Sequence, residues 1–302
     1  MKSVVADILL SVTLLREEEK FILEALEKEG LKVSVLRKEE LGDCLDSGIN
    51  STLALVRNLS HRDALGVARL LEYSGTKTLN TSRAIEFCSN KAYQGMAFYN
   101  HAVPHPEFRI AFSVEDVATA GSTFGWPYIV KPVDASWGRG VVRIVDDNCF
   151  ESWAGGRESC DVGEKSFPVI VQREINKGDF DIRVVVIGYD PVVAFKRVSS
   201  HWKTNTHLGA SVEPILLSAA IREVCHKLVN VVGPGFYGID LFEDQESGNI
   251  MVCEINHNPE FSRSMKIHGV KIPELLARYI KSSLELGDSR HDVVMDHAAV
   301  FV

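Results

Sequence analysis

The N-terminal segment alternates an apolar strand, an amphipathic helix and a second strand. Residues 4–10 are a short apolar run, and the following stretch places Phe21, Ile22, Ala25 and Leu26 on one helical face before Gly30. A strand over residues 31–37 follows, and a strand over 53–57 and a helix over 63–74 continue the pattern. A β-α-β order predicts a small parallel-sheet domain. The segment contains no G-x-G-x-x-G, so a nicotinamide-type phosphate loop is not supported.

Composition limits the classes of function. The 302 residues carry a net charge of −8, which argues against general nucleic-acid or membrane-surface binding because both surfaces attract positive charge. No apolar run approaches the roughly 20 residues of a transmembrane helix. Asp7 interrupts the first apolar run and no small-residue cleavage site follows, so a signal peptide is not predicted and a cytoplasmic protein is expected. The six cysteines are scattered without a C-x-x-C pair, which indicates reduced, buried thiols rather than a zinc site.

The remaining sequence divides into two larger segments and a tail. The first contains a helix over residues 90–101, a helix over 114–124, a strand over 128–131 and a Gly-containing loop over 132–140. The second is rich in alternating strands, at 168–175, 181–188, 191–199, 236–244 and 249–256, with a helix over 218–231. We therefore predict an α/β and α+β protein with domains 1–80, 81–167 and 168–286, and a weakly patterned tail at 287–302.

Three oxygen-bearing side chains are expected to meet on one hairpin. Side chains alternate between the faces of a strand, so Glu254 and Asn256 should point one way while Cys253 and Ile255 point into packing. Asp240 lies on the neighbouring strand. Two carboxylates and an amide form an oxygen site suited to magnesium on nucleotide phosphates. The alternative is an ordinary solvated hairpin face.

A second group of residues could bind phosphate. Lys131 ends an apolar strand beside the loop that contains Gly138 and Gly140, where backbone N–H groups can approach phosphate oxygens. Arg183, Lys196 and Arg197 lie on consecutive strands, and fixed cations suit phosphoryl transfer. The alternatives are a surface turn for the loop and strand-face salt bridges for the cations. His201 beside Trp202 is better explained by packing than by catalysis.

The order of these motifs resembles the ATP-grasp superfamily over the last two-thirds of the sequence. Within it, the sequence is similar to RimK-type glutamate ligases and most of all to the amino-group-carrier-protein (LysW) ligases of lysine and arginine biosynthesis (LysX/ArgX type). The motifs that carry the resemblance are KPVDASWGRG, QREINKGDFDIRVVV, SSHWKTNT, GIDLFE and EINHNPEF. The RNLSHR stretch from Arg57 to Arg62 and the CSNK run ending at Lys91 also fit. The resemblance implies an N-terminal β-α-β domain and two lobes that enclose ATP.

The resemblance also implies site residues. Lys91 and Lys131 would bind ATP phosphates, Arg197 and Lys131 would act in catalysis, and Asp240, Glu254 and Asn256 would bind magnesium, with two ions expected. The other implied ATP-binding residues are Ala135, Ser136, Trp137, Gly138, Arg139, Gly140, Val141, Gln172, Arg173, Glu174, Ile175, Asp181, Arg183 and Asn205. The implied substrate residues are Arg197, Thr206, His207, Asn258, Pro259, Glu260, Phe261, Ser262, Arg263 and Ser264.

The implied reaction joins a carboxylate to an amine. The carboxylate attacks the γ-phosphate of ATP and the amine then displaces phosphate from the acyl phosphate, so positioning and electrostatics carry catalysis. In the carrier-protein ligases the carboxylate belongs to the C-terminal glutamate of a small acidic carrier and the amine is 2-aminoadipate or glutamate. Such a carrier would need a local basic patch, with Arg57, Arg62 and Arg263 as candidates. A homo-oligomer, dimer or tetramer, is expected.

Two departures from the family pattern concern the substrate. Arg263-Ser264 matches neither the aminoadipate nor the glutamate signature, and Gly209-Ala210 stands where the family has Gly-Gly. The alternatives are a RimK-type ligase that adds glutamate to another protein or a cofactor, and a non-catalytic ATP-binding regulatory module. Retention of all three metal-ligand candidates and of Arg197 argues against the module.

Overall fold

The N-terminal part forms a four-stranded parallel sheet. The computed structural model describes residues 4–159, 167–204 and 211–285. The first sheet has the order β2-β1-β3-β4, and apolar side chains such as Ile8 and Leu10 of its central strand are fully buried. Its elements are β1 (Val4–Val12), α1 (Glu17–Lys28), β2 (Val33–Arg37), the 3₁₀ turn η1 (Lys38–Glu40), α2 (Leu41–Ser47), β3 (Ile49–Arg57), α3 (His61–Tyr73) and β4 (Lys77–Leu79). The predicted parallel-sheet domain is confirmed.

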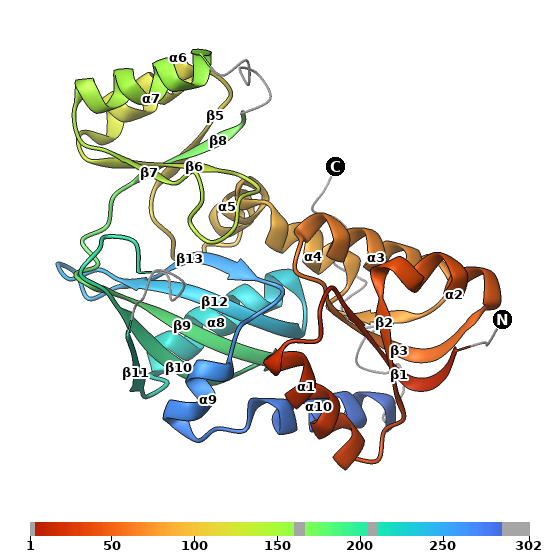
Figure 1. Cartoon of the computed structure of the whole chain (residues 1–302). Coiled ribbons are helices and arrows are strands. Elements are labelled where there is room, and N and C mark those ends of the chain that lie inside the picture. Colours follow the sequence, from red (N-terminus) through yellow and green to blue (C-terminus); the bar gives the residue numbers. More distant parts are fainter. Residues whose placement is uncertain (1–3, 160–166, 205–210, 286–302) are drawn as a thin grey trace.

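A second, antiparallel sheet forms the small lobe at the top of Figure 1. Its order is β5-β8-β6-β7, and α6 and α7 cover one face. Tyr128 and Val130 point to these helices, whereas the alternate residues Ile129 and Lys131 point to the opposite face. The elements are β5 (Phe108–Ala111), α6 (Val114–Phe124), β6 (Tyr128–Pro132), β7 (Val142–Ile144), α7 (Asp147–Ser159) and β8 (Val169–Arg173).

The third sheet is five-stranded and antiparallel. Its order is β11-β10-β9-β12-β13, and α8 packs on one face together with α4 and α5. The even-numbered residues of β9, such as Ile182 and Val184, enter this core, while Val185 and Ile187 face the other side. The elements are α4 (Ser82–Ser89), α5 (Lys91–Asn100), β9 (Phe180–Gly188), β10 (Asp190–Val198), β11 (Ser211–Ile215), α8 (Ala219–Val232), β12 (Gly235–Glu243) and β13 (Ile250–Asn256).

The end of the described chain returns to the N-terminal domain. After α9 (Ser262–His268), α10 (Ile272–Glu285) packs against α1, and Lys281 forms an ion pair with Glu29. Residues of β1, β9 and α10 share one hydrophobic core (Figure 1). The N-terminal domain and the third sheet are therefore joined by apolar packing, and the small lobe stands apart from this core. The domain boundaries given above stay a prediction.

Arg57 is the buried polar link in this junction. Its side chain is 1% exposed, forms an ion pair with Glu19 at 3.1 Å and donates to the Pro259 carbonyl. The guanidinium also lies over the rings of Phe236 and Phe261. The prediction that Arg57 contributes to a surface basic patch is therefore wrong, because its charge is neutralised inside the protein. None of the described helices has the length and apolar character needed to cross a membrane.

Candidate active site

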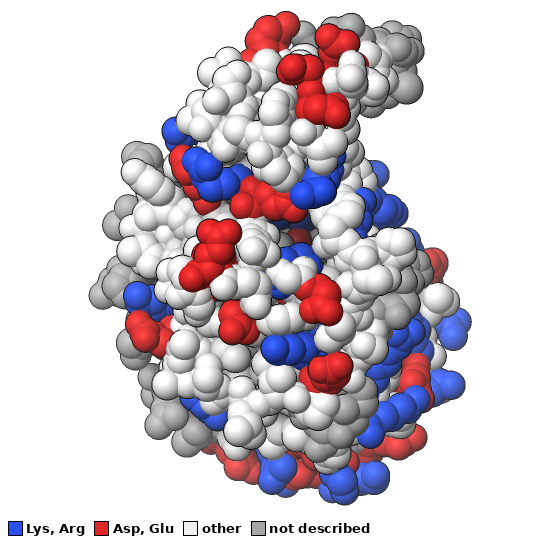
Figure 2. Space-filling view, turned by 90° about the vertical axis from the view of Figure 1, so that its left-hand side faces the viewer, with Lys and Arg blue, Asp and Glu red and all other residues white. Residues whose placement is uncertain are grey.

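Two cavities meet where the small lobe faces the third sheet. The larger has a volume of about 800 Å³ and extends to the N-terminal domain; the smaller has about 150 Å³ and lies between the two sheets. Both are lined by Arg197, Asp240 and Glu254. Figure 2 shows acidic and basic side chains interleaved at the junction below the small lobe. The two cavities thus share one charged wall, and ligands in them could meet there.

Strand alternation places four charges of this wall on one sheet face. Asp181 and Arg183 precede Val185 and Ile187 on the same side of β9, and β10 and β12 add Arg197 and Asp240. Arg197 binds Asp181 through both carboxylate oxygens, at 2.6 and 2.8 Å, and reaches Asp240 at 3.1 Å. Arg183 forms a second bidentate pair with Asp240. Burial raises the pKa of Asp240, whereas the two guanidinium groups lower it.

The charge state of this wall follows from these pairs. Burial would lower the pKa of Arg197, but Asp240 and Asp181 outweigh it and raise that pKa. For Asp240 the larger effect is burial, which raises the pKa of the carboxyl group above its ordinary value despite Arg183 and Arg197. Arg197 is thus a fixed cation, held by a planar double contact that a lysine could not reproduce.

Glu254 lies opposite Asp240 and is surrounded by different cations. Lys91, at the start of α5, approaches its carboxylate at 3.5 Å, and Asn256 donates to it at 3.2 Å. Burial would raise the pKa of Glu254, but Lys91 and Lys131 outweigh it and lower that pKa to about 2. Lys131 itself donates to Gln172 at 2.7 Å. Glu254, whose side chain is 25% exposed, is therefore a partly buried anion with lysine partners, and Asn256 binds it through its amide nitrogen and not its carbonyl oxygen.

A β-bulge at Cys253 changes the predicted alternation. Asp240 pairs with Glu254 but Leu241 pairs with Val252, so Cys253 is an extra residue on β13. Cys253 therefore lines the smaller cavity beside Glu254, 3.8 Å from the Lys131 amine. The prediction that Cys253 points into packing is wrong for this reason, while Ile255 is buried as expected. Burial raises the pKa of the Cys253 thiol to about 11, so it is uncharged at neutral pH.

The Gly-containing loop lies between the two cavities. Trp137, Gly138 and Gly140 adopt left-handed backbone angles, with φ of 58°, 69° and 67°. A Cβ at Gly140 would lie 2.8 Å from the Pro132 side chain, so this position requires glycine. Lys91 donates to the Ala135 carbonyl, and Lys203 donates to the Gly138 carbonyl at 3.4 Å. The two lysines thus bind loop carbonyl groups at the cavity edge.

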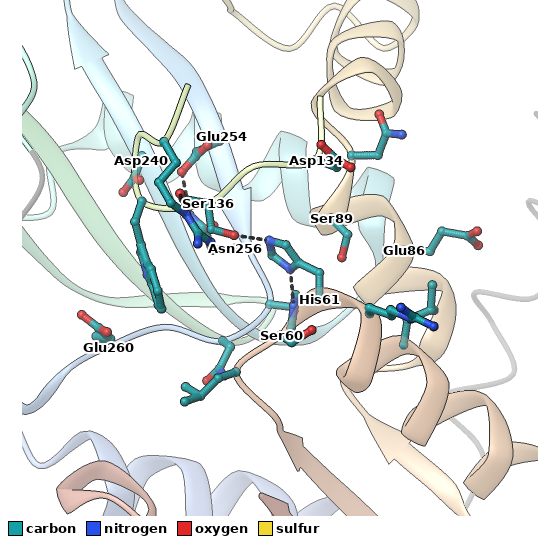
Figure 3. A pocket seen from close by; sticks show the side chains of 18 of the residues that line it. Ser60, His61, Glu86, Ser89, Asp134, Ser136, Asp240, Glu254, Asn256 and Glu260 are labelled. Carbon is teal, nitrogen blue, oxygen red and sulfur yellow. Dashed lines mark hydrogen bonds between the residues drawn. The ribbon is translucent and has the colours of Figure 1, made fainter. Parts of the chain in front are cut away.

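Sequence reasoning did not identify two histidines beside this loop. His61 contacts Ser136 at 2.7 Å and His257 at 2.9 Å, and it lines the larger cavity (Figure 3). Burial lowers the pKa of His61, and it lowers that of His257 to about 3 with the help of His61 and Arg57. Both rings are therefore neutral at pH 7. A lone histidine in a sequence carries little signal, although His61 lies in the Arg57–Arg62 stretch and His257 in the EINHNPEF motif.

Most predicted ATP-binding residues gather at the two cavities. Arg173 is an exception, because it pairs with Glu107 and donates to the Phe124 carbonyl outside them, and Asn205 lies outside the described residues. Gly140 supports the loop without lining either cavity. The smaller cavity is lined by Lys91, Lys131, Ala135, Gly138, Val141, Gln172, Glu174, Ile175 and Asp181; the larger is lined by Ser136, Trp137, Arg139 and Arg183.

The predicted substrate residues are less concentrated. Asn258 and Glu260 line the larger cavity, and the Pro259 carbonyl accepts from Arg57. The Phe261 ring is 1% exposed in the core, so it supports the cavity wall from behind. Thr206 and His207 lie outside the described residues. Ser262 and Arg263 begin α9 and line neither cavity, and the Ser264 side chain is outside what the structure describes.

Several further lining residues were absent from the sequence predictions. Lys196 packs over the Phe180 ring on the opposite sheet face, so it is not part of the site. Phe242 could have been found, because alternation places it on the same face as Asp240. Others come from loops whose approach is not visible in a pattern. Arg62, a candidate for the basic patch, lines the larger cavity. The added cavity residues include Arg16, Ser60, Glu86, Asp134, Ile129, Lys177, Gly178, Trp202, Lys203, Thr204 and Phe242.

Comparison with known proteins agrees with this arrangement. Residues 88–280, nearly two-thirds of the sequence, match the RimK-like ATP-grasp domain. The chain belongs to the RimK-like ATP-grasp family. Members of this ligase family use ATP and a divalent metal ion, which fits the two cavities and the carboxylates at their junction. The predicted fold and enzyme class are confirmed.

Two curated relatives of the family cover nearly the whole sequence. The α-aminoadipate–LysW ligase LysX of Sulfurisphaera tokodaii is 31% identical over 89% of this chain and 95% of its own length. The glutamate–LysW ligase ArgX of Sulfolobus acidocaldarius is 32% identical over 91% of this chain and 98% of its own. The two relatives differ in their named amino acid but match this chain about equally.

Two solved ATP-grasp structures share the fold of this chain. A RimK-domain ATP-grasp protein of Sphaerobacter thermophilus has a TM-score of 0.73 at 20% identity, covering 91% of this chain and 99% of its own. The ATP-grasp ligase PsnB, in complex with a minimal precursor, has a TM-score of 0.72 at 18% identity, with 92% and 99% covered. At these identities the likeness concerns the fold alone.

Proposed function

We propose that the protein is an ATP-dependent carboxylate–amine ligase that joins 2-aminoadipate or glutamate to the C-terminal glutamate of an acidic amino-group carrier protein. The observation that carries this proposal is the junction of the two cavities at Arg197, Asp240 and Glu254. A nucleotide in the smaller cavity would place its terminal phosphate at this junction, and the larger cavity would present the carboxylate and the amine to it.

The smaller cavity has suitable groups for the nucleotide. Lys91 and Lys131 would bind phosphate oxygens, and the loop from Ala135 to Val141 would cover them with backbone N–H groups. The segment from Gln172 to Ile175 connects the small lobe to the third sheet and would meet the adenine. Ile129 and Phe242 supply apolar surface there. Lysines that now bind loop carbonyls and Glu254 would turn to the phosphates.

The donor set at the junction suits magnesium. Among the residues that the structure describes, no group of three or more His, Cys, Asp or Glu side chains forms a metal site. The protein would supply only two carboxylates and the Asn256 amide oxygen as metal ligands. Phosphate oxygens and water would complete the coordination shell of the ion, as is usual for Mg²⁺. Two ions held by Asp240, Glu254 and Asn256 would neutralise phosphate charge. Arg183 and Arg197 would then be released in part from Asp240 toward the transferred group.

The residues of this chain act mainly by position and charge. A substrate carboxylate attacks the γ-phosphate, ADP leaves, and the amine displaces phosphate from the acyl phosphate. Arg197 is held by Asp181 in the wall that both cavities share, so its guanidinium can stabilise charge on the transferring phosphoryl group. No side chain needs to form a covalent bond. Substrates that fill the larger cavity would limit the access of water to the acyl phosphate.

The larger cavity offers arginines to acidic substrates, beside acidic side chains such as Glu86 and Asp134. Arg16, Arg62 and Arg139 line it, although the protein as a whole carries a charge of −8. A carrier ending in glutamate and an amino acid with a side-chain carboxylate would each find a cation. The relatives named for LysW support the carrier, and they divide between α-aminoadipate and glutamate. Arg62 and Arg139 are exposed at the surface, so an acidic carrier could reach them.

The test is ADP release with Mg-ATP, an acidic carrier ending in glutamate, and either 2-aminoadipate, glutamate or no amine. Release that needs the carrier and one amine, with a matching mass increase of the carrier, supports the proposal and identifies the amine. Release with glutamate and a different acceptor would favour a RimK-type ligase instead. Nucleotide binding without release under any of these conditions would favour a regulatory module.

A further inference from the structure

One hydrogen-bonded series joins the three parts of the protein at the edge of the larger cavity. Ser136 belongs to the loop of the small lobe, His61 begins α3 of the N-terminal domain, and His257 follows β13 of the third sheet. The Ser136 hydroxyl lies 2.7 Å from His61 Nε2, and His61 Nδ1 lies 2.9 Å from His257 Nε2. Figure 3 shows His61 between the loop and the sheet.

The surroundings of the two histidine rings restrict their movement. The His257 side chain is 2% exposed, and its other ring nitrogen has no hydrogen-bond partner among the described residues. The two rings lie 5.1 Å apart with a 59° tilt, so each ring limits rotation of the other. A neutral imidazole has one donor and one acceptor nitrogen, so His61 can bridge a hydroxyl group and a second imidazole. His61 thus presents a defined nitrogen to the loop.

Two lysine contacts with the loop would compete with the nucleotide. Lys91 binds the Ala135 carbonyl and Lys203 binds the Gly138 carbonyl. Both lysines line the smaller cavity, where their charges would turn to phosphate oxygens. The Ser136–His61 bond uses no cation and lies on the larger cavity. It can therefore persist when phosphates occupy the smaller cavity.

We propose that His61 is a positioning residue that holds the phosphate-covering loop over the nucleotide through Ser136, with His257 fixing the His61 ring. This inference rests on the nucleotide-binding part of the proposed function. It makes the N-terminal domain a partner in covering the nucleotide. It also makes the wall of the larger cavity depend on the Ser136–His61 contact, because Ser136, Trp137 and His61 all line that cavity.

The experiment is a double-mutant cycle with His61→Ala, Ser136→Ala and the double variant. Binding of a non-hydrolysable ATP analogue with Mg²⁺ is measured by calorimetry without carrier or amine. Each single variant should bind about five- to tenfold more weakly, the effect of one hydrogen bond, and the double variant should be no weaker than the singles. His61→Gln, which keeps a donor and an acceptor, should recover part of the loss. His226→Ala and Ser152→Ala, at exposed helical positions, are the matched controls.

Trp137 provides a second measurement beside the loop serine. Acrylamide quenching of Trp137, taken as the difference from the Trp137→Phe protein, should increase in both single variants with the analogue bound. If His61→Ala lowers the melting temperature of the protein, Ser136→Ala still tests the same hydrogen bond from the side of the loop. The role of His61 would be overturned if the affinity losses of the two single variants multiplied in the double variant. Unchanged analogue binding and unchanged quenching in the single variants would overturn it as well. Absence of analogue binding by the unmodified protein would overturn the nucleotide site itself.

Discussion

Asp240 and Glu254 lie directly opposite one another on β12 and β13 but belong to different ion-pair networks. Asp240 is bound by the guanidinium groups of Arg183 and Arg197, whereas Glu254 is bound by Lys91 and Asn256. The buried Asp240 and the partly buried Glu254 would repel each other without these partners. The separate networks keep both available at the point where the cavities meet, and each can be tested by itself.

Replacement of Glu254 by Gln should abolish turnover and preserve the fold. The change keeps the shape but removes the charge that a metal ion would need, so we expect at least a hundredfold loss of kcat, measured as ADP release. Circular dichroism and thermal unfolding check the fold. Glu246→Gln, in the exposed turn between β12 and β13, is the control and should keep full activity. Turnover near the unmodified rate in Glu254→Gln would refute the metal assignment.

Replacement of Arg197 by Lys should lower kcat more than nucleotide affinity. Lysine keeps the charge but cannot bind both oxygens of Asp181, so the cation loses its fixed position. We expect a loss of about 10²- to 10³-fold in kcat, with little change in the Kd of an ATP analogue. Lys196→Ala is the neighbouring control, because that side chain lies on the other face of the sheet. A change confined to KM would make Arg197 a binding residue.

Strand patterns predicted much of the fold and of this charged wall. The alternation along β9 separates Ile182 and Val184 from Asp181 and Arg183, and it is visible in the sequence. The bulge at Cys253 could not be predicted, because one extra residue in a strand leaves no compositional mark. The burial of Arg57 was also hidden, since its partners Glu19, Phe236 and Pro259 are distant in sequence. Local patterns define faces, and tertiary contacts decide which charges are buried.

Replacement of Gly140 by Ala should weaken nucleotide binding through the loop. The position has a φ of 67°, and a Cβ there would lie 2.8 Å from the Pro132 side chain, so the loop must shift. We expect the KM for ATP to rise about tenfold, since strain of this kind costs about 1–3 kcal/mol. The control is Gly156→Ala on α7, where a Cβ meets nothing within 4 Å. It should stabilise the helix by about 0.5–1 kcal/mol without changing KM. Equal KM values for the two variants would contradict the loop geometry.

Glu19 should make the free energy of unfolding depend on acid pH. Burial alone would raise its pKa, but hydrogen bonds and charges from Arg16 and Arg57 outweigh burial and lower it. A carboxyl group with a folded-state pKa below its unfolded value of about 4.3 contributes stability above that value and loses it as pH falls through the folded pKa.

Urea unfolding at pH 7 should therefore show Glu19→Gln less stable by about 1.5–3 kcal/mol, the range for hydrogen bonds to a charged group. The difference from the unmodified protein should shrink as the pH falls below about 4.3. Glu24→Gln, exposed on the same helix, should follow the unmodified protein at every pH. A Glu19→Gln deficit that is constant with pH would show that the ionised pair with Arg57 does not contribute to the free energy of unfolding.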